Sequence, residues 1–385
     1  IIIWLIFHYY LCILRYINNN VNLNYSTFDI WLSKKIVIYY SHMIKVFSGV
    51  RPSGKLHLGN YLGAIKNWIE LQDKAEQAIF AVVDYHGITT PFDPKKYHEQ
   101  VMDVVLDYLA AGVDPDKALL IRQSKVPQHT ELAWIFNTIT PVSWLDRLPT
   151  YKEQLEKSPK YNHMGLLDYP VLMAADILIY KSNLVSVGED QMPHIDLTNE
   201  IAKKFNSMFG ETFEPIKAHM ALGARIMSLQ DPKKKMSKTP HQADPLTAKN
   251  GGGLGAGQAG DDSCIFLVDS PDMIRTKIKK ATTDSEKEVI YDEDNKPGIA
   301  NLMTIYALLD LNIKNLKQIE TMYAGKSYAE FKSDLAEVIV NFLKPFQEKY
   351  DELKKNPDHI MSVLTKSEEK AKVLASSTLK EVKER

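Results

Sequence analysis

The chain has 385 residues, of which 45% are hydrophobic and 25% are charged, enough apolar material for a large core and a second domain. The formal net charge of −1 excludes nucleic-acid binding through a basic field spread over the whole protein, so an RNA partner needs a local basic surface. Only two cysteines occur, Cys12 and Cys264. Their spacing excludes a disulfide framework and a structural zinc site, and it fits a reducing compartment.

Residues 1–42 differ in composition from the rest of the chain. The run "IIIWLIFHYYLCIL" is apolar for 14 residues apart from His8, which is short of the roughly 20 residues that a membrane helix needs. It also lacks the basic start and the small-residue cleavage site of a signal peptide. We expect this segment to be an extension outside a fold that begins at Met43. A membrane anchor is the alternative.

From Met43 onward, strand-like and helix-like segments alternate. Short β-branched and aromatic runs over 44–50, 78–86 and 118–124 each end in polar residues. Between them, 62–72 and 98–112 carry apolar residues at i, i+3, i+4 spacing, and the second ends at a glycine. This order predicts a parallel sheet with helices on its faces and ligands at the carboxyl ends of the strands.

Two later segments, 184–191 and 223–229, have the same strand-then-loop form and are expected to complete the sheet. The chain then changes to long Lys/Glu-rich helical patterns without strands. Between these parts, 241–265 is Gly-rich, and we expect a loop or insertion there instead of a phosphate cradle, because no G-K-[ST] follows it. The predicted organisation is an α/β domain over 43–240 and a helical domain over 266–385.

The stretch "RPSGKLHLGNYLGA" (51–64) places small and polar residues where a loop becomes a helix. Gly59 lets a polyanion approach the backbone, and the start of a helix directs free N–H groups and a positive dipole end to the same space. His57 and Asn60, three residues apart, lie on one side of the first turn and can donate to a phosphate. An ordinary capped helix behind a turn is the alternative.

A second cluster, "DPKKKMSKT" (231–239), follows the segment 223–229. Lysine runs are usually solvated faces. Here Lys235 and Lys238 flank Met236 and Ser237, a pattern suited to a mobile loop that binds a triphosphate through point charges.

The two signatures, His-Leu-Gly-Asn early and Lys-Met-Ser-Lys-Thr later, resemble those of class I aminoacyl-tRNA synthetases. The stretches "GLLDYPVLMAADILIY", "VGEDQMPHIDLTNEIAKKFN" and "TDSE" followed by "KPGIANL" are similar to the bacterial-type tryptophanyl-tRNA synthetases. The resemblance runs from Met43 to near the C-terminus, except in the Gly-rich segment, and residues 1–42 have no counterpart in it. It implies a Rossmann-like catalytic domain followed by an all-helical domain that reads the tRNA anticodon.

The resemblance implies that ATP and L-tryptophan form tryptophanyl-adenylate and that the acyl group then passes to tRNA(Trp). Mg²⁺ would be bound through the nucleotide, with no dedicated protein metal site. The implied catalytic residues are His57, Asn60, Lys235 and Lys238. The implied ATP-binding positions are Arg51, Pro52, Ser53, Gly59, Asn60, Gly188, Glu189, Asp190, Ile226, Lys235, Met236, Ser237, Lys238 and Thr239.

The apolar segment 169–180 is predicted to be a helix. Asp176 is its only charged residue, and a carboxylate there is costly unless it has a partner. An indole N–H needs one acceptor inside an apolar slot, so Asp176 suits a tryptophan side chain, and the resemblance implies the same role. The alternative is a helix cap or a buried salt bridge. The implied tryptophan-binding positions are Asp176, Phe47, Val83, His86, Tyr169, Met173 and Gln191.

The chain departs from the family at "RLPTYKEQ" (147–154), where Gln154 stands at the position of a lysine. Any ATP contact of that lysine is then absent, or taken over by Lys152, Lys157 or Lys160. The second signature ends in Thr239 instead of serine, which keeps the hydroxyl.

Three other functions remain open. Tyrosine specificity is one, because a phenol O–H can also bind Asp176. A small-cofactor nucleotidyltransferase shares the His-containing turn but needs neither the lysine loop nor a long helical domain. A non-catalytic amino-acid- or RNA-binding protein is expected to have lost signature residues. The resemblance further implies a homodimer, a cytoplasmic location and no membrane partner.

Overall fold

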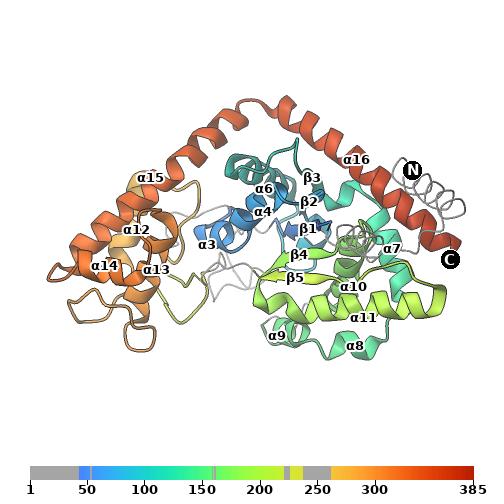
Figure 1. Ribbon diagram of the computed structural model, residues 1–385, viewed down its shortest axis with the longest axis horizontal. Coiled ribbons are helices and arrows are strands. Elements are labelled where there is room, and N and C mark those ends of the chain that lie inside the picture. The colour runs from blue at the N-terminus through green and yellow to red at the C-terminus, as the bar shows by residue number, and fades with distance from the viewer. Residues whose placement is uncertain (1–42, 53, 158, 160–161, 221–225, 237–261) are drawn as a thin grey trace, which may run out of the picture. The chain divides into compact units, whose positions relative to one another are not determined.

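A parallel five-stranded sheet, in the order β3-β2-β1-β4-β5, organises the computed structural model (Figure 1). The structure describes residues 43–52, 54–157, 159, 162–220, 226–236 and 262–385. The strands are β1 (Lys45–Val50), β2 (Gln77–Val82), β3 (Leu119–Arg122), β4 (Leu184–Val187) and β5 (Lys217–Met220). In register, Phe47 pairs with Ile79, and Ile79 pairs with Leu119. The apolar β1 and β2 are buried because helices cover both faces of the sheet.

The predicted strands over 44–50, 78–86, 118–124 and 184–191 are confirmed, but the last three end earlier than predicted, and residues 189–191 form a helical turn after β4. Residues 84–87 form a helical turn after β2, and 123–125 form another after β3. The prediction of a strand over 223–229 is wrong for its described part, 226–229, which pairs locally with the lysine cluster through an antiparallel bridge between Met227 and Lys235. The fifth strand is Lys217–Met220, a short segment with a lysine and a histidine that breaks the apolar pattern.

Helices lie on both faces of the sheet, with α4 and α6 on one face and α10 and α11 on the other (Figure 1). The predicted helices over 62–72, 98–112 and 169–180 are confirmed, and Gly112 ends α6 in a left-handed conformation (φ 111°). The helices and helical turns of this part are α3 (Leu58–Asn60), η1 (Tyr61–Ile65), α4 (Lys66–Gln72), α5 (Asp84–Gly87), α6 (Tyr97–Ala111), η2 (Gln123–Lys125), α7 (Gln128–Asn137), α8 (Val142–Asp146), α9 (Pro149–Lys157), α10 (Met164–Leu178), η4 (Glu189–Gln191) and α11 (Met192–Phe209).

Aromatic packing fixes the end of β1 from which the His-Leu-Gly-Asn segment departs. Trp68 of α4 stacks on Phe80 of β2, with ring centroids 4.9 Å apart, and meets Tyr108 of α6 edge-on at 5.1 Å. The Tyr108 hydroxyl accepts a hydrogen bond from the backbone N–H of Val50 (3.0 Å) and donates to the carbonyl of Ala81 (3.3 Å). A buried hydroxyl thus ties the carboxyl ends of β1 and β2 together.

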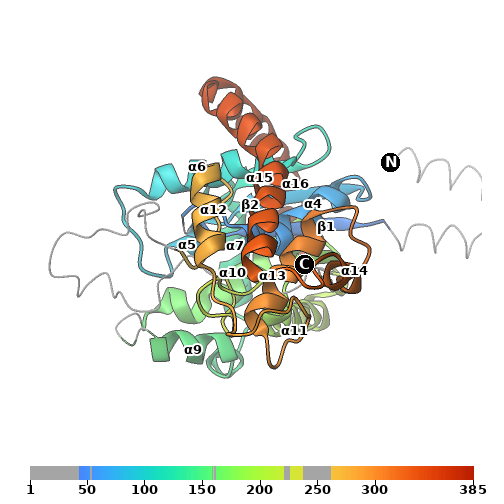
Figure 2. The same ribbon diagram turned by 90° about the vertical axis from the view of Figure 1, so that its left-hand side faces the viewer.

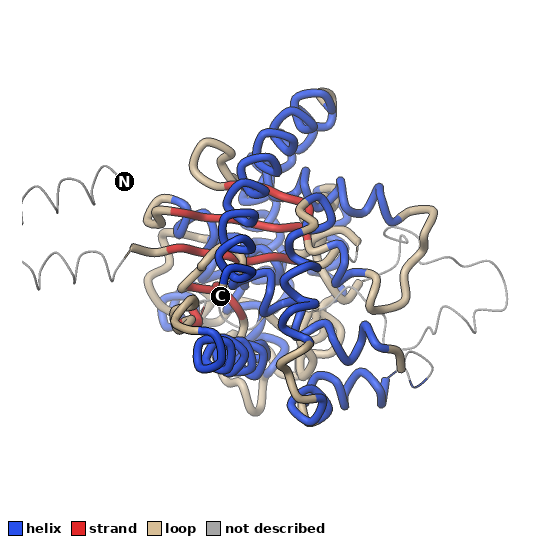
Figure 3. Tube along the Cα trace, turned by 90° about the vertical axis from the view of Figure 1, so that its right-hand side faces the viewer, coloured by secondary structure: helices blue, strands red, loops and turns tan. Residues whose placement is uncertain are grey.

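The rest of the described chain is helical, as predicted. It consists of α12 (Pro271–Lys280), α13 (Pro297–Leu309), α14 (Leu316–Met322), α15 (Tyr328–Lys354) and α16 (Pro357–Glu384). Helix α12 lies beside α15 (Figure 2), and α15 also packs on α6. Helix α16 then returns to the α/β part and lies along β3 and α7 (Figure 3). Residues Lys45–Arg385 form one compact unit, and the domain boundaries near residues 240 and 266 stay predictions.

Two of the expected segments fall largely beyond what the structure describes. Residues 1–42 lie outside the described residues, as do 241–261 of the Gly-rich segment. Among the helices that are described, none is both long and apolar enough to cross a membrane.

Candidate functional site

His57 caps the helical stretch that begins at Leu58. Its Nδ1 accepts a hydrogen bond from the backbone N–H of Asn60 (3.3 Å), and Asn60 Oδ1 accepts one from the backbone N–H of His57 (3.2 Å). Because Nδ1 is an acceptor, a neutral His57 ring carries its hydrogen on Nε2. The capped helix, the alternative interpretation of this stretch, is therefore present in the structure. A phosphate role is compatible with it, since Nε2–H and the Asn60 amide are donors at the positive end of the helix.

The segment 264–267 pairs with the chain around His57. The backbone N–H of Leu58 donates to the carbonyl of Ile265 (2.8 Å). Lys277 of α12 holds this segment in place, because its buried ammonium bonds to Asp269 Oδ2 at 2.6 Å. Sequence reasoning assigned the first part of this segment to a loop, and the short apolar run "CIFL" was its only signal.

The two signatures meet at Gly59. A Cβ built on Gly59 would lie 3.5 Å from the Cβ of Met236. Met236 is buried and donates its backbone N–H to the carbonyl of Ile226 (2.9 Å), which closes the turn that presents Lys235. Lys235 Nζ lies 3.8 Å from Asp190 Oδ1. The two predicted phosphate-binding segments, 51–64 and 231–239, therefore lie next to each other and to the "GEDQ" segment (188–191).

The "GEDQ" segment follows β4 at the carboxyl edge of the sheet. A Cβ on Gly188 would lie 2.6 Å from Asp190 Oδ1, so a larger residue there would displace the exposed Asp190 carboxylate. Gln191 Nε2 donates to Asp190 Oδ2 (2.9 Å). Partial burial raises the pKa of Asp190, but the Gln191 hydrogen bond and the charge of Lys235 outweigh it, so the pKa lies below its ordinary value. Asp190 is exposed and ionised beside Lys235, and Glu189 is exposed next to it.

Asp176 of α10 is 1% exposed and accepts hydrogen bonds from three side chains. His86 Nε2 bonds to Oδ2 (2.7 Å) and His129 Nδ1 to Oδ1 (2.6 Å). Gln123 Nε2 donates to both oxygens, at 2.7 and 2.9 Å. The other ring nitrogen of His129, Nε2, lies 2.7 Å from the hydroxyl of Tyr180. Asp176 therefore anchors a buried polar network at the carboxyl ends of β2 and β3.

This network keeps Asp176 ionised. Burial raises the pKa of Asp176. The hydrogen bonds from His129 and His86 lower the pKa by more than burial raises it, so it lies below the ordinary value. Burial raises the pKa of Tyr180 well above its usual range, so this phenol keeps its proton. One fixed, buried negative charge is thus held by His86, His129 and Gln123.

Aromatic and apolar residues predicted to surround an indole lie around this network. Phe47 of β1 is buried and stacks on Tyr180 with centroids 5.7 Å apart. Val83 is buried in the same core, and Tyr169 and Met173, on the helix that carries Asp176, are half-buried against it. The structure brings these residues together within one apolar neighbourhood.

His194 of α11 joins this neighbourhood next to Tyr169. Its Nε2 lies 2.9 Å from the Tyr169 hydroxyl, which donates to Thr150 Oγ1 at 3.0 Å. Burial, with a smaller contribution from nearby His86, lowers the pKa of His194 to about 4, so His194 is neutral at pH 7. Its buried Nδ1 has no hydrogen-bond partner among the described residues.

The remaining predicted positions differ in exposure. Arg51 is exposed, and its charge opposes the rise that burial causes in the pKa of Tyr169. Pro52 and Ile226 are buried, and the carbonyl of Ile226 accepts the backbone N–H of Met236. Gln154 of α9 is half-buried. The predicted positions Ser53, Ser237, Lys238 and Thr239 lie outside the described residues.

Sequence reasoning missed Gln123, His129 and His194. Their roles depend on contacts between elements far apart in the chain, which no local motif reveals. Of these three residues, only Gln123 could have been predicted from the sequence. It is the first residue after Arg122, which ends β3, and ligands bind at the carboxyl ends of parallel strands.

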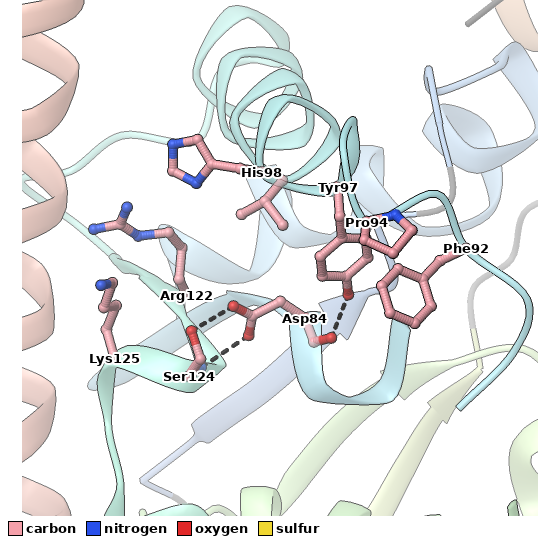
Figure 4. Close-up of a pocket in the computed structure, with 9 residues that line it drawn as sticks. Asp84, Phe92, Pro94, Tyr97, His98, Arg122, Ser124 and Lys125 are labelled. Atoms are coloured by element: carbon pink, nitrogen blue, oxygen red, sulfur yellow. Dashed lines mark hydrogen bonds between the residues drawn. The ribbon is translucent and has the colours of Figure 1, made fainter. Parts of the chain in front are cut away.

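A cavity of about 310 Å³ is lined by residues of η2 and of the segments around α5 and α6 (Figure 4). Its lining residues are Asp84, Phe92, Pro94, Tyr97, His98, Val101, Arg122, Ser124 and Lys125. No group of three or more His, Cys, Asp or Glu in the described parts of the chain is arranged to hold a metal ion.

Comparison with known proteins places this geometry in a family. The profile of the family described as "tRNA synthetases class I (W and Y)" matches residues 40–344. The tryptophan–tRNA ligase of Helicobacter pylori is 44% identical over 346 residues, which cover 89% of this chain and 98% of that protein.

Two solved structures are also similar. The tryptophanyl-tRNA synthetase of Mycoplasma pneumoniae has a TM-score of 0.75 and 31% identity, covering 88% of this chain and 95% of its own. That of Campylobacter jejuni, complexed with ADP and tryptophan, has a TM-score of 0.73 and 31% identity, covering 89% and 99%. Together with the convergence of both signatures on Gly59, these likenesses show that the chain belongs to the class I tRNA synthetases of the tryptophan and tyrosine type.

Proposed function

We propose that this protein is a tryptophan–tRNA ligase, which forms tryptophanyl-adenylate and pyrophosphate from L-tryptophan and ATP and then charges tRNA(Trp). The observation that carries the proposal is the buried, ionised Asp176 within an aromatic neighbourhood. An indole N–H is a donor without acceptor capacity, so a fixed carboxylate is its matching partner. The relatives at 42–44% identity, all named tryptophan–tRNA ligases, support this choice over tyrosine.

The Asp176 carboxylate can accept a hydrogen bond from the indole N–H if Gln123 gives up one of its two contacts. A carboxylate offers about four acceptor sites, and Gln123 Nε2 spans both oxygens. In the proposed complex Gln123 keeps one of its two contacts and the indole N–H takes the other. Phe47, Val83, His86, Tyr169, Met173 and Gln191 form the rest of the proposed tryptophan site.

The activation step needs no covalent enzyme intermediate and no protein base. The tryptophan carboxylate attacks the α-phosphorus of ATP in line and pyrophosphate leaves, so the protein contributes position and charge stabilisation. His57 and Asn60 donate to the phosphates from the start of the helix, and Lys235 and Lys238 do so from the lysine cluster. The ADP-bound neighbour supports a nucleotide site in this fold.

Gly59 and the "GEDQ" segment border the proposed nucleotide position. Gly59 brings backbone close to the phosphates, and the exposed Glu189 and Asp190 can accept from ribose hydroxyls. Mg²⁺ bound to the pyrophosphate oxygens would neutralise charge that develops there. The exposed Lys152 of α9 is the described lysine nearest in sequence to Gln154, and its takeover of an ATP contact stays a prediction.

The proposal extends to the second step and to assembly. The acyl group passes to the terminal adenosine of tRNA(Trp), while the helical domain over 266–385 binds the anticodon. A homodimer and a cytoplasmic location complete the proposal, as the resemblance implies.

Charging of tRNA tests this function. The full chain is incubated with ATP, Mg²⁺, bacterial total tRNA and radiolabelled tryptophan or tyrosine, and acid-precipitable label is counted. We expect label from tryptophan only. Label from tyrosine only would establish tyrosine specificity, and no label from either would favour a non-catalytic protein.

A further inference from the structure

Glu368 of α16 forms a buried ion pair with Arg122, the last residue of β3. Arg122 Nε donates to Glu368 Oε1 (2.7 Å) and Nη2 donates to Oε2 (3.0 Å), in the two-pronged geometry that is the strongest form of this interaction. Both side chains are under 10% exposed. Oε1 also accepts the backbone N–H of Arg122 (3.3 Å), so Glu368 holds the main chain as well as the side chain.

The two residues after Arg122 bond to the amino-acid site. Gln123 Nε2 donates to both Asp176 oxygens, and its Oε1 accepts the backbone N–H of Tyr85 (3.0 Å). Ser124 donates its backbone N–H to Asp84 Oδ1 (2.8 Å), and its hydroxyl bonds to Oδ2 of the same residue. Three consecutive residues therefore connect α16, Asp176 and the turn that carries His86.

The segment Arg122–Lys125 borders a cavity on one side. The cavity has a volume of about 310 Å³, and Arg122, Ser124 and Lys125 are among the residues that line it (Figure 4). A segment that lies against a cavity lacks packed neighbours on that side, so specific hydrogen bonds decide its position. The bonds at Arg122 come from a residue remote in the sequence, on the final helix.

We propose that Glu368 is a positioning residue for the amino-acid site. By fixing the main chain at Arg122, it sets the place from which Gln123 presents its amide to Asp176. Glu368 touches neither substrate, and it acts on the affinity for the amino acid and not on the nucleotide. This inference rests on the proposed function.

The test measures tryptophan-dependent ATP–pyrophosphate exchange by the full chain. Glu368→Gln removes the charge but keeps the shape. Arg122→Met combined with Glu368→Met replaces the pair by apolar side chains, which usually restores the stability that a broken buried pair loses. The matched control is Glu381→Gln on the same helix, whose ion pair with Lys181 (2.6 Å) is partly exposed. Tm is measured for each variant.

We expect KM for tryptophan to rise about tenfold in both Glu368 variants, the effect of one lost buried hydrogen bond, with KM for ATP within about twofold. Glu381→Gln should leave both constants unchanged. A double Met variant with wild-type Tm and wild-type KM for tryptophan would overturn the proposal, as would equal rises in both KM values. Wild-type protein without tryptophan-dependent exchange would overturn the proposed function and the inference with it, whereas unchanged variants of an active enzyme overturn the inference alone.

Discussion

Gly59 and Met236, remote in sequence, lie against each other at the first turn of the helix that His57 caps. A Cβ on Gly59 would come within 3.1 Å of His57 Nδ1 and 3.5 Å of Met236 Cβ. The distance to Met236 is an ordinary van der Waals contact, whereas the His57 ring would have to shift to make room for a side chain at position 59. Gly59→Ala should displace the His57 ring by a few tenths of an ångström and lower kcat for exchange about tenfold, since phosphate contacts depend on such distances.

Gly63, one turn further along the same helical stretch, provides the control. A Cβ there meets nothing within 4 Å. Gly63→Ala should leave kcat unchanged and raise stability by about 1 kcal/mol through helix propensity. Equal activity of the two variants would show that the space at Gly59 has no role in catalysis.

Replacing the buried carboxylate tests the amino-acid site. Asp176→Asn removes the charge and places an N–H₂ group against two donors, one histidine and Gln123, so we expect a loss of about 3 kcal/mol in the free energy of unfolding. Tryptophan-dependent exchange should fall at least a hundredfold in kcat/KM. Urea unfolding and exchange kinetics on the same preparation measure both effects.

Asp168, also on α10, is the matched control for Asp176. It is half-buried and accepts one hydrogen bond, from Asn137 Nδ2 (2.9 Å). Asp168→Asn should cost about 1 kcal/mol or less and leave KM for tryptophan unchanged. If Asp176→Asn kept full tryptophan specificity, the carboxylate would not be the indole partner.

The lysine cluster should act mainly on turnover. Lys235→Met removes a charge beside Asp190 whose contact with the phosphates strengthens as charge develops, so kcat should fall about a hundredfold and KM for ATP less than threefold. Lys238→Ala is expected to show the same split. Lys234→Met, which breaks only an exposed pair with Asp231 (3.0 Å), should change neither constant. A rise in KM for ATP alone would mean that Lys235 binds the ground state.

His194 gives the fold a specific pH dependence. The unfolded chain protonates this histidine with the ordinary pKa of 6.5 and the folded chain with a pKa of about 4, so protonation favours unfolding. As pH falls from 6.5 to 4, wild type should lose about 3 kcal/mol relative to His194→Gln. Above pH 7 the difference between the two should be constant. If the free energies of unfolding of wild type and His194→Gln changed in parallel from pH 7 to pH 4, His194 would not be a buried histidine that is neutral in the folded protein.

The sequence predicts the β1-to-α6 order well because each of these elements has a strong local period. It fails at β5, because Lys217–Met220 is short and partly polar, while the more strand-like 226–229 satisfies its backbone against the lysine cluster. At the site, His57 and Asn60 follow from a local motif. His129 and Gln123 do not, since only the folded sheet brings them to Asp176.

The central claim, that the Asp176 pocket selects tryptophan for activation, is tested most directly by amino-acid-dependent ATP–pyrophosphate exchange with the full chain and each of the twenty amino acids in turn. We predict that tryptophan supports exchange with a kcat/KM at least a thousandfold above that of tyrosine, because the buried Asp176 carboxylate is matched to the indole N–H. Exchange supported equally by tyrosine, or by no amino acid, would contradict it.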